Sequence, residues 1–121
     1  MIPVDQTLFW TEEESHGNCM QAAVASLLEL PLIEVPDFWI SNHFWKAVYE
    51  FFNARKMIFK GMARKDIPND TYYIVIGDSP RGATKHAVVY INGQMVHDPH
   101  PSRAGILTEE IFKIIVSMTE K

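Results

Sequence analysis

The stretch CMQAAVASLLEL, residues 19–30, constrains the fold of this chain more than any other feature, because it consists mostly of good helix formers and has almost no polar face. A helix that is apolar on most of its sides has to be surrounded by other elements. Pro31 follows the stretch and cannot continue the helix. The sequence therefore predicts a central, buried helix over residues 18–30.

The remaining elements are predicted from periodicity and residue type. Aromatic and aliphatic residues recur at helical spacing within residues 38–54, which predicts a second helix, and Trp10, Trp39 and Trp45 are expected in the core. β-branched and aromatic residues dominate 71–78, 85–91 and 94–99, and they favour strands at 57–62 and 112–118. TEEES, residues 11–15, is typical of a solvated loop. Helices first and antiparallel strands later predict an α+β fold, with the N-terminal central helix packed on a C-terminal sheet.

Length and charge restrict the function. A chain of 121 residues is the size of one domain, here residues 1–121. The net charge of −4 and the absence of a basic stripe argue against nucleic-acid binding. No apolar run reaches the roughly 18 residues that span a bilayer, and the N-terminus lacks the pattern of a signal peptide. One cysteine excludes an internal disulfide framework, so we expect a cytoplasmic protein that needs no cofactor.

The single cysteine, Cys19, stands where the central helix is expected to begin. In the first turn of a helix the backbone N–H groups lack helix acceptors, and the positive end of the helix dipole favours a thiolate over a thiol. A lone cysteine is more often a small buried hydrophobe, so this position needs a base nearby before it indicates a nucleophile.

Five histidines are available as bases: His16, His43, His86, His97 and His100. His86 is the best of them, because it opens the strand HAVVYI directly after the loop DSPRGATK, where a side chain can emerge into a cleft. Asp98 ends the following strand and is the candidate that would orient the His86 ring.

The hairpin between these residues decides whether they can meet. A two-residue turn at Asn92-Gly93 in a regular ladder would put His86 and Asp98 on opposite faces of the sheet. A three-residue loop that begins at Ile91 would place them directly opposite each other, with Cβ atoms about 5 Å apart. A catalytic pairing therefore requires the three-residue loop, or a bulge with the same effect.

GNCMQAAVASLL followed by HAVVYINGQMVHDPHPSRAG resembles the papain-like cysteine peptidase superfamily, and HAVV…DP is most similar to its leader-cleaving bacteriocin peptidases. The whole chain also resembles small uncharacterised proteins of bacteria and phages. The resemblance implies a papain-like fold with Cys19 as nucleophile, His86 as base and Asp98 as the group that holds the histidine. It further implies that Gln6 donates to the oxyanion, although Gln6 lies farther upstream of the cysteine than in papain, and Met20 replaces papain's aromatic residue.

This resemblance and the residues together predict a thiol-dependent hydrolase that cleaves a peptide, isopeptide or other amide bond through an acyl-enzyme. Arg81, Gly82 and Asn18 are the candidate substrate contacts, and Arg103 is a further candidate. The sequence leaves open acyl transfer by the same residues, a zinc site built from Cys19, His86, His97, Asp98 and His100, and a catalytically silent binding protein on the same fold. It also leaves open the oligomeric state.

Overall fold

The computed structural model describes residues 1–9 and 17–118 of the chain. Two α-helices, α1 (Cys19–Leu28) and α2 (Phe44–Ala54), precede five strands, and the short 3-10 helices are η1 (Leu32–Glu34), η2 (Phe38–Ile40) and η3 (Arg64–Asp66). The strands are β1 (Met57–Gly61), β2 (Tyr72–Asp78), β3 (Lys85–Ile91), β4 (Gln94–His97) and β5 (Ile111–Ser117). The predicted α+β arrangement of N-terminal helices on an antiparallel sheet is confirmed.

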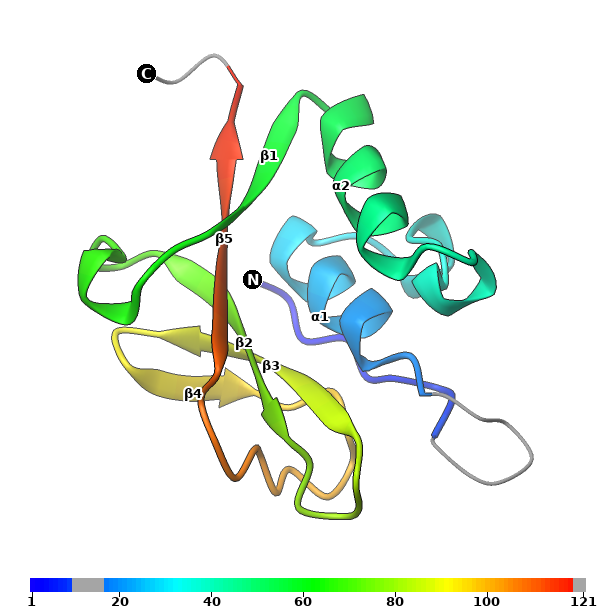
Figure 1. The fold of residues 1–121 in the computed structure, drawn as a ribbon, viewed down its shortest axis with the longest axis vertical. Helices are drawn as coiled ribbons and strands as arrows, with labels where there is room; N and C mark the ends of the chain where they lie inside the picture. The colour runs from blue at the N-terminus through cyan, green and yellow to red at the C-terminus, as the bar shows by residue number, and fades with distance from the viewer. Residues whose placement is uncertain (10–16, 119–121) are drawn as a thin grey trace.

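The sheet has the order β1-β5-β2-β3-β4, and each neighbouring pair is antiparallel. β5 thus confirms the strand predicted for the C-terminal segment, and it lies between β1 and β2 (Figure 1). α1 lies between the N-terminal segment and α2, and it contacts β3 and β2 (Figure 1). The predicted loop at residues 11–15 lies outside the described residues.

α1 is the buried central helix that the sequence predicts, with Ala22, Ala23 and Val24 fully inaccessible to solvent. It ends earlier than expected, because Glu29 adopts a left-handed conformation with φ 57°. The N–H groups of Glu29 and Leu30 then bond back to the last turn and close the helix before Pro31 is reached.

The helix predicted to cover most of residues 38–54 is confirmed as α2, and η2 occupies the start of that stretch. Val48, Phe51 and Phe52 of α2 are buried, and the Phe52 ring stacks on Phe59 of β1 with centroids 4.6 Å apart. α2 therefore packs on the β1 end of the sheet. In the described residues, no helix is long and apolar enough to cross a membrane.

The β3–β4 hairpin has the two-residue turn. Asn92 and Gly93 have φ 52° and 80°, and Ile91 pairs with Gln94, so the three-residue loop, one of the two alternatives that the catalytic pairing allows, is not present. Both turn positions need positive φ, which Gly and Asn accept most easily, and such a turn matches the twist of the strands.

A bulge in β4 restores the pairing that the two-residue turn would destroy. Tyr90 pairs with Met95, but Val89 pairs with His97, so Val96 is an extra residue in β4. Continuing this register puts Asp98 opposite Val88, on the same face of the sheet as His86 and diagonal to it. The bulge therefore restores the shared face that the pairing requires, but not the directly opposed positions that a three-residue loop would give.

Candidate active site

Cys19 is the first residue of α1 and is partly buried. The side chain of the N-cap residue, Asn18, does not cap the helix, and the first turn contains no acidic residue. The Asn18 side chain therefore leaves the first-turn N–H groups uncapped, and no carboxylate in that turn opposes a thiolate.

His86 and Asp98 meet as predicted. His86 Nε2 lies 2.6 Å from Asp98 Oδ1, and the two side chains are 4% and 0% exposed. The Asp98 carboxylate also accepts the backbone N–H groups of His100 at 2.9 Å and Gly105 at 2.8 Å. Burial by itself raises the pKa of Asp98, but the hydrogen bonds from His86, His100 and Gly105 outweigh burial and lower this pKa to about 2.

Cys19 and His86 line the same cleft, and Cys19 is among the groups that act on the charge of the His86 ring. Because Nε2 faces Asp98, the other ring nitrogen, Nδ1, is left for the thiol. Burial by itself lowers the pKa of His86, yet the interactions with Asp98 and Cys19 raise it to about 9. The imidazole is thus protonated at neutral pH and placed between two groups that carry or can carry negative charge.

Gln6 reaches the same site despite its distance in sequence from Cys19. Leu8 and Asn18 are joined by a backbone hydrogen bond of 3.2 Å, which brings the N-terminal segment beside the start of α1. Gln6 is 7% exposed and lines the same cleft as Cys19. Its Nε2 donates to the Leu8 carbonyl at 2.9 Å, while Oε1 has no hydrogen-bond partner among the described residues.

Asn18, predicted as a substrate contact, holds the N-terminal segment. Its Oδ1 accepts the N–H groups of Thr7 at 2.9 Å and Leu8 at 2.7 Å, and its Nδ2 donates to Thr7 and Gln21. The side chain is buried and is not among the described residues that line the cleft. Its contacts therefore give Asn18 a positioning role, and a contact with substrate stays a prediction.

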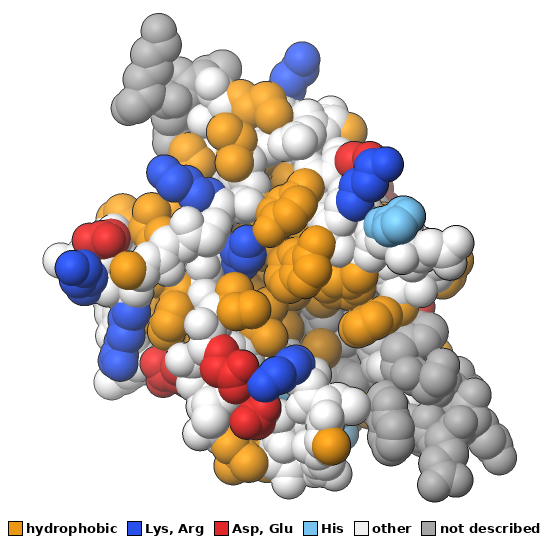
Figure 2. Space-filling view, in the orientation of Figure 1, with side chains coloured by type: hydrophobic (Ala, Val, Ile, Leu, Met, Phe, Trp, Pro, Cys, Tyr) orange, Lys and Arg blue, Asp and Glu red, His pale blue; other side chains and the backbone are white. Residues whose placement is uncertain are grey.

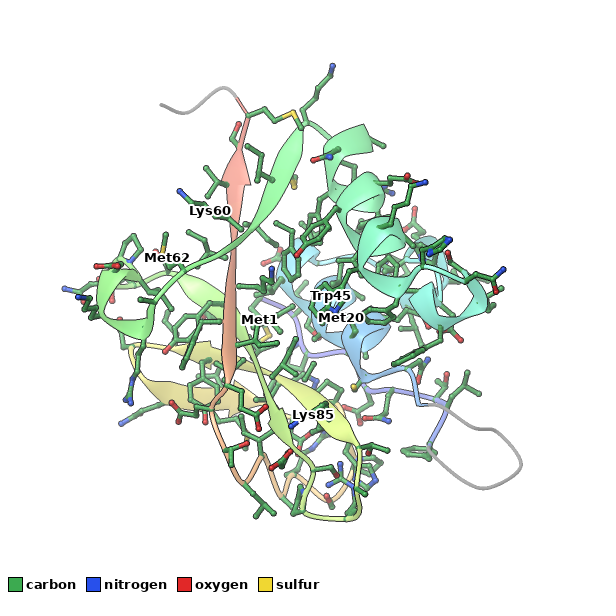
Figure 3. All side chains as sticks on the ribbon, viewed as in Figure 1. Met1, Met20, Trp45, Lys60, Met62 and Lys85 are labelled. Atoms are coloured by element: carbon green, nitrogen blue, oxygen red, sulfur yellow. The ribbon has the colours of Figure 1, made fainter. Side chains whose placement is uncertain are left out.

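A cleft of about 550 Å³ contains Cys19 and His86. On the face of the molecule shown in Figure 2, hydrophobic side chains gather beside α2, and charged side chains lie below them. In Figure 3, Met20 and Trp45 lie close together between α1 and α2, and Lys85 lies at the start of β3; all three line the cleft. Cys19 and His86 therefore face a mainly apolar cleft with a polar end, and Asp98 lies buried behind His86.

The tryptophans correct one prediction. Trp39 is 52% exposed, and it lines the cleft together with Trp45, so neither is solely a core residue. The helical spacing found the apolar face of α2 but could not tell which part of that face the sheet covers. Trp10 lies outside the described residues.

Arg81 and Gly82 line the cleft from the β2–β3 loop, as expected of substrate contacts. Arg103 instead bonds to both carboxylate oxygens of Asp5, at 2.6 and 2.9 Å, and to the Asp98 carbonyl. It therefore ties the N-terminal segment to the loop that holds Asp98.

His100 is a site residue whose place in the cleft the sequence did not predict. It lines the cleft, its ring centroid lies 6.4 Å from that of His86, and its Nδ1 lies 2.9 Å from Ser102 Oγ. Its only signal in the sequence was its position two residues after Asp98. His97 points elsewhere, with Nε2 2.8 Å from the Val4 carbonyl.

Among residues 1–9 and 17–118, no group of three or more His, Cys, Asp or Glu side chains is arranged to hold a metal ion. The zinc alternative therefore gains no support from the described side chains. No family model, no curated protein and no solved structure matches this chain significantly. The case for a function accordingly rests on the site itself.

Proposed function

We propose that this chain is a thiol-dependent amide hydrolase with a papain-like arrangement of Cys19, His86 and Asp98. The observation that carries the proposal is the buried His86–Asp98 pair, with 2.6 Å between Nε2 and Oδ1, beside a mainly apolar cleft that Cys19 and His86 both line. A nucleophile needs a base and a group that orients the base, and His86 and Asp98 have the chemistry for these two roles.

The proposed reaction begins from an ion pair of the Cys19 thiolate and the His86 imidazolium. The raised pKa of His86, about 9, supports this state at neutral pH, since the protonated ring stabilises a neighbouring thiolate. Asp98 has a lowered pKa, stays ionised and fixes the ring through Nε2. A single free thiol of this kind suits a reducing cytoplasm.

In the first step the thiolate attacks the amide carbonyl, which forms a C–S bond and an oxyanion. The Cys19 backbone N–H at the helix start donates to that oxyanion, and the second Nε2 hydrogen of Gln6 is the further donor. The C–N bond then breaks, and His86 gives its proton to the leaving amine. Water attacks the thioester with His86 as base, which releases the acid and regenerates the thiol; an amine in place of water gives acyl transfer.

The test is the rate of Cys19 alkylation by iodoacetamide at pH 6 and pH 9, in the wild type and in His86→Ala. In the wild type we expect the rate at pH 6 to be within a few-fold of the rate at pH 9, because the imidazolium keeps the thiol ionised. In His86→Ala the rate at pH 6 should fall by at least about tenfold relative to pH 9.

His43→Ala is the matched control, since His43 precedes α2 and is exposed. It should keep the wild-type profile. Slow alkylation with the same pH dependence in all three proteins would mean that His86 does not activate Cys19, and the proposal would be abandoned.

A further inference from the structure

The two ends of the cleft differ in chemistry. One end is walled by large apolar side chains from α1, η2 and α2: Met20, Trp39, Phe44 and Trp45. The other end is formed by the β2–β3 loop, with Ser79, Arg81, Gly82 and Thr84. Cys19 and His86 line the same cleft, and the loop leads directly into His86.

Among the residues that the structure describes, the positive charge of Arg81 at the polar end has no ion-pair partner. No Asp or Glu is found among the described residues that line the cleft. Lys85 is neutralised by Asp78 at 2.6 Å and Glu110 at 2.8 Å. Arg81 makes no ion pair with any described residue, and its Nη1 donates only to Ser102 Oγ at 3.1 Å, so most of its five N–H donors remain available.

His100 adds to the same end. Its pKa is lowered, first by burial and next by the positive charge of Arg81, so the ring favours its neutral form beside the guanidinium. Arg81 and His100 are bridged by the Ser102 hydroxyl, which lies within hydrogen-bond distance of both. This bridge holds the guanidinium near the rim of the cleft.

The proposed reaction determines on which side of Cys19 the amine part and the acyl part of a substrate lie. The leaving nitrogen has to come within hydrogen-bond distance of His86 to receive its proton, so the amine part of a substrate lies on the His86 side of the thiol. That side leads to the β2–β3 loop and Arg81. The acyl part then extends past Cys19 toward Met20 and the aromatic wall.

We propose that the substrate is an amide between a bulky apolar acyl group and an amine that carries a carboxylate, and that Arg81 binds this carboxylate. This rests on the proposed function. Arginine suits the task, because its planar guanidinium can hold both oxygens of a carboxylate at once. The bond that breaks is the amide C–N bond, the proton on the leaving amine comes from His86, and water supplies the oxygen of the released acid.

Binding to the inactive Cys19→Ala variant tests the inference without requiring turnover. The probes are N-benzyloxycarbonyl-phenylalanyl-glycine with its free carboxylate and the corresponding carboxamide, titrated by calorimetry or NMR. The free acid should bind about tenfold more tightly than the carboxamide. Adding Arg81→Gln should abolish this preference by weakening the acid alone, and Arg81→Lys should keep part of it.

Arg64→Gln, added to Cys19→Ala, is the charge-matched control, because Arg64 is exposed and pairs with Glu109 outside the cleft. It should keep the tenfold preference. Equal binding of the two probes, a preference that survives Arg81→Gln, or no binding of either probe at millimolar concentration would overturn the inference. An Arg81-dependent preference together with an unactivated Cys19 in the wild type would preserve the inferred ligand chemistry and refute the proposed hydrolase.

Discussion

At the scale of single residues, Gly77 makes room for the chain beside the candidate base. It pairs with His86 across β2 and β3, and a Cβ at this position would lie 1.7 Å from the Thr108 carbonyl oxygen. The segment before β5 crosses there, with Leu107 N–H donating to the Asp78 carbonyl at 2.8 Å. Only a residue without a side chain permits this approach.

Gly77→Ala is therefore expected to lower the free energy of unfolding by at least about 2 kcal/mol, because backbone rather than a flexible side chain has to move. Urea unfolding followed by circular dichroism measures the change. Gly82→Ala is the control, since an added Cβ meets nothing within 4 Å, and its effect should stay within about 0.5 kcal/mol. Equal stability of the two variants would show that the Thr108 segment moves aside without cost.

At the scale of elements, the first turn of α1 is joined to a segment that lies far from it in sequence. Asn18 accepts the N–H groups of Thr7 and Leu8 and so places the backbone next to Gln6. The sequence predicted that Gln6 would face the thiol only through a family resemblance. Gln6 lies near the thiol because the buried Asn18 amide holds the backbone beside it. No local pattern in residues 1–9 indicates this contact.

Asn18→Ala should lower the free energy of unfolding by about 1–3 kcal/mol, because the Thr7 and Leu8 backbone donors of two partly buried hydrogen bonds lose their acceptor. Asn18→Asp keeps the acceptor oxygens and should recover at least half of the loss. Hydrogen exchange of the Thr7 and Leu8 amides gives a local readout, and it should accelerate in the alanine variant only. Unchanged exchange there would show that Asn18 does not hold this segment.

At the scale of the whole molecule, three contacts join the N-terminal segment to the end of β4 and the loop that follows it. Gln6 N–H donates to the Pro99 carbonyl at 3.0 Å, and Arg103 pairs with Asp5. His97 Nε2 lies 2.8 Å from the Val4 carbonyl. Through these contacts, Gln6 from the N-terminal segment and His86 from β3 line one cleft with Cys19 at the start of α1.

The His86–Asp98 pair predicts how stability depends on pH. The pKa of His86 rises from 6.5 to about 9 on folding, so its contribution is fully present below pH 6.5 and is lost as pH rises through 9. The pKa of Asp98 falls from 3.8 to about 2, so its contribution is present above pH 3.8 and is lost as pH falls through 2. The pair therefore stabilises the fold most between pH 3.8 and pH 6.5.

Urea unfolding of the wild type and of His86→Gln at pH 5, 7 and 9 tests this linkage. The wild type should lose stability between pH 6.5 and 9, and His86→Gln should lose less over the same interval. A decline of equal size in both proteins would assign the alkaline loss to other groups.

The sequence by itself determined most of the elements and named the candidate site residues. The nearly unbroken apolar character of residues 19–30 requires a buried helix, and β-branched runs require strands, whereas a thiol at a helix start indicates a nucleophile only together with a base. These conclusions depend on local periodicity and residue type, which a linear sequence displays directly.

Only the tertiary structure decided how those residues meet. The register of β3 and β4 depends on an extra residue, Val96. Valine is typical of regular strands, so the residue type at this position does not indicate a bulge. The position of Trp45 in the cleft likewise depends on where the sheet stops covering α2, and that of Trp39 on how η2 packs beside α2. Bulges and cleft walls arise from the packing of segments distant in sequence, and that packing leaves no periodic trace within either segment.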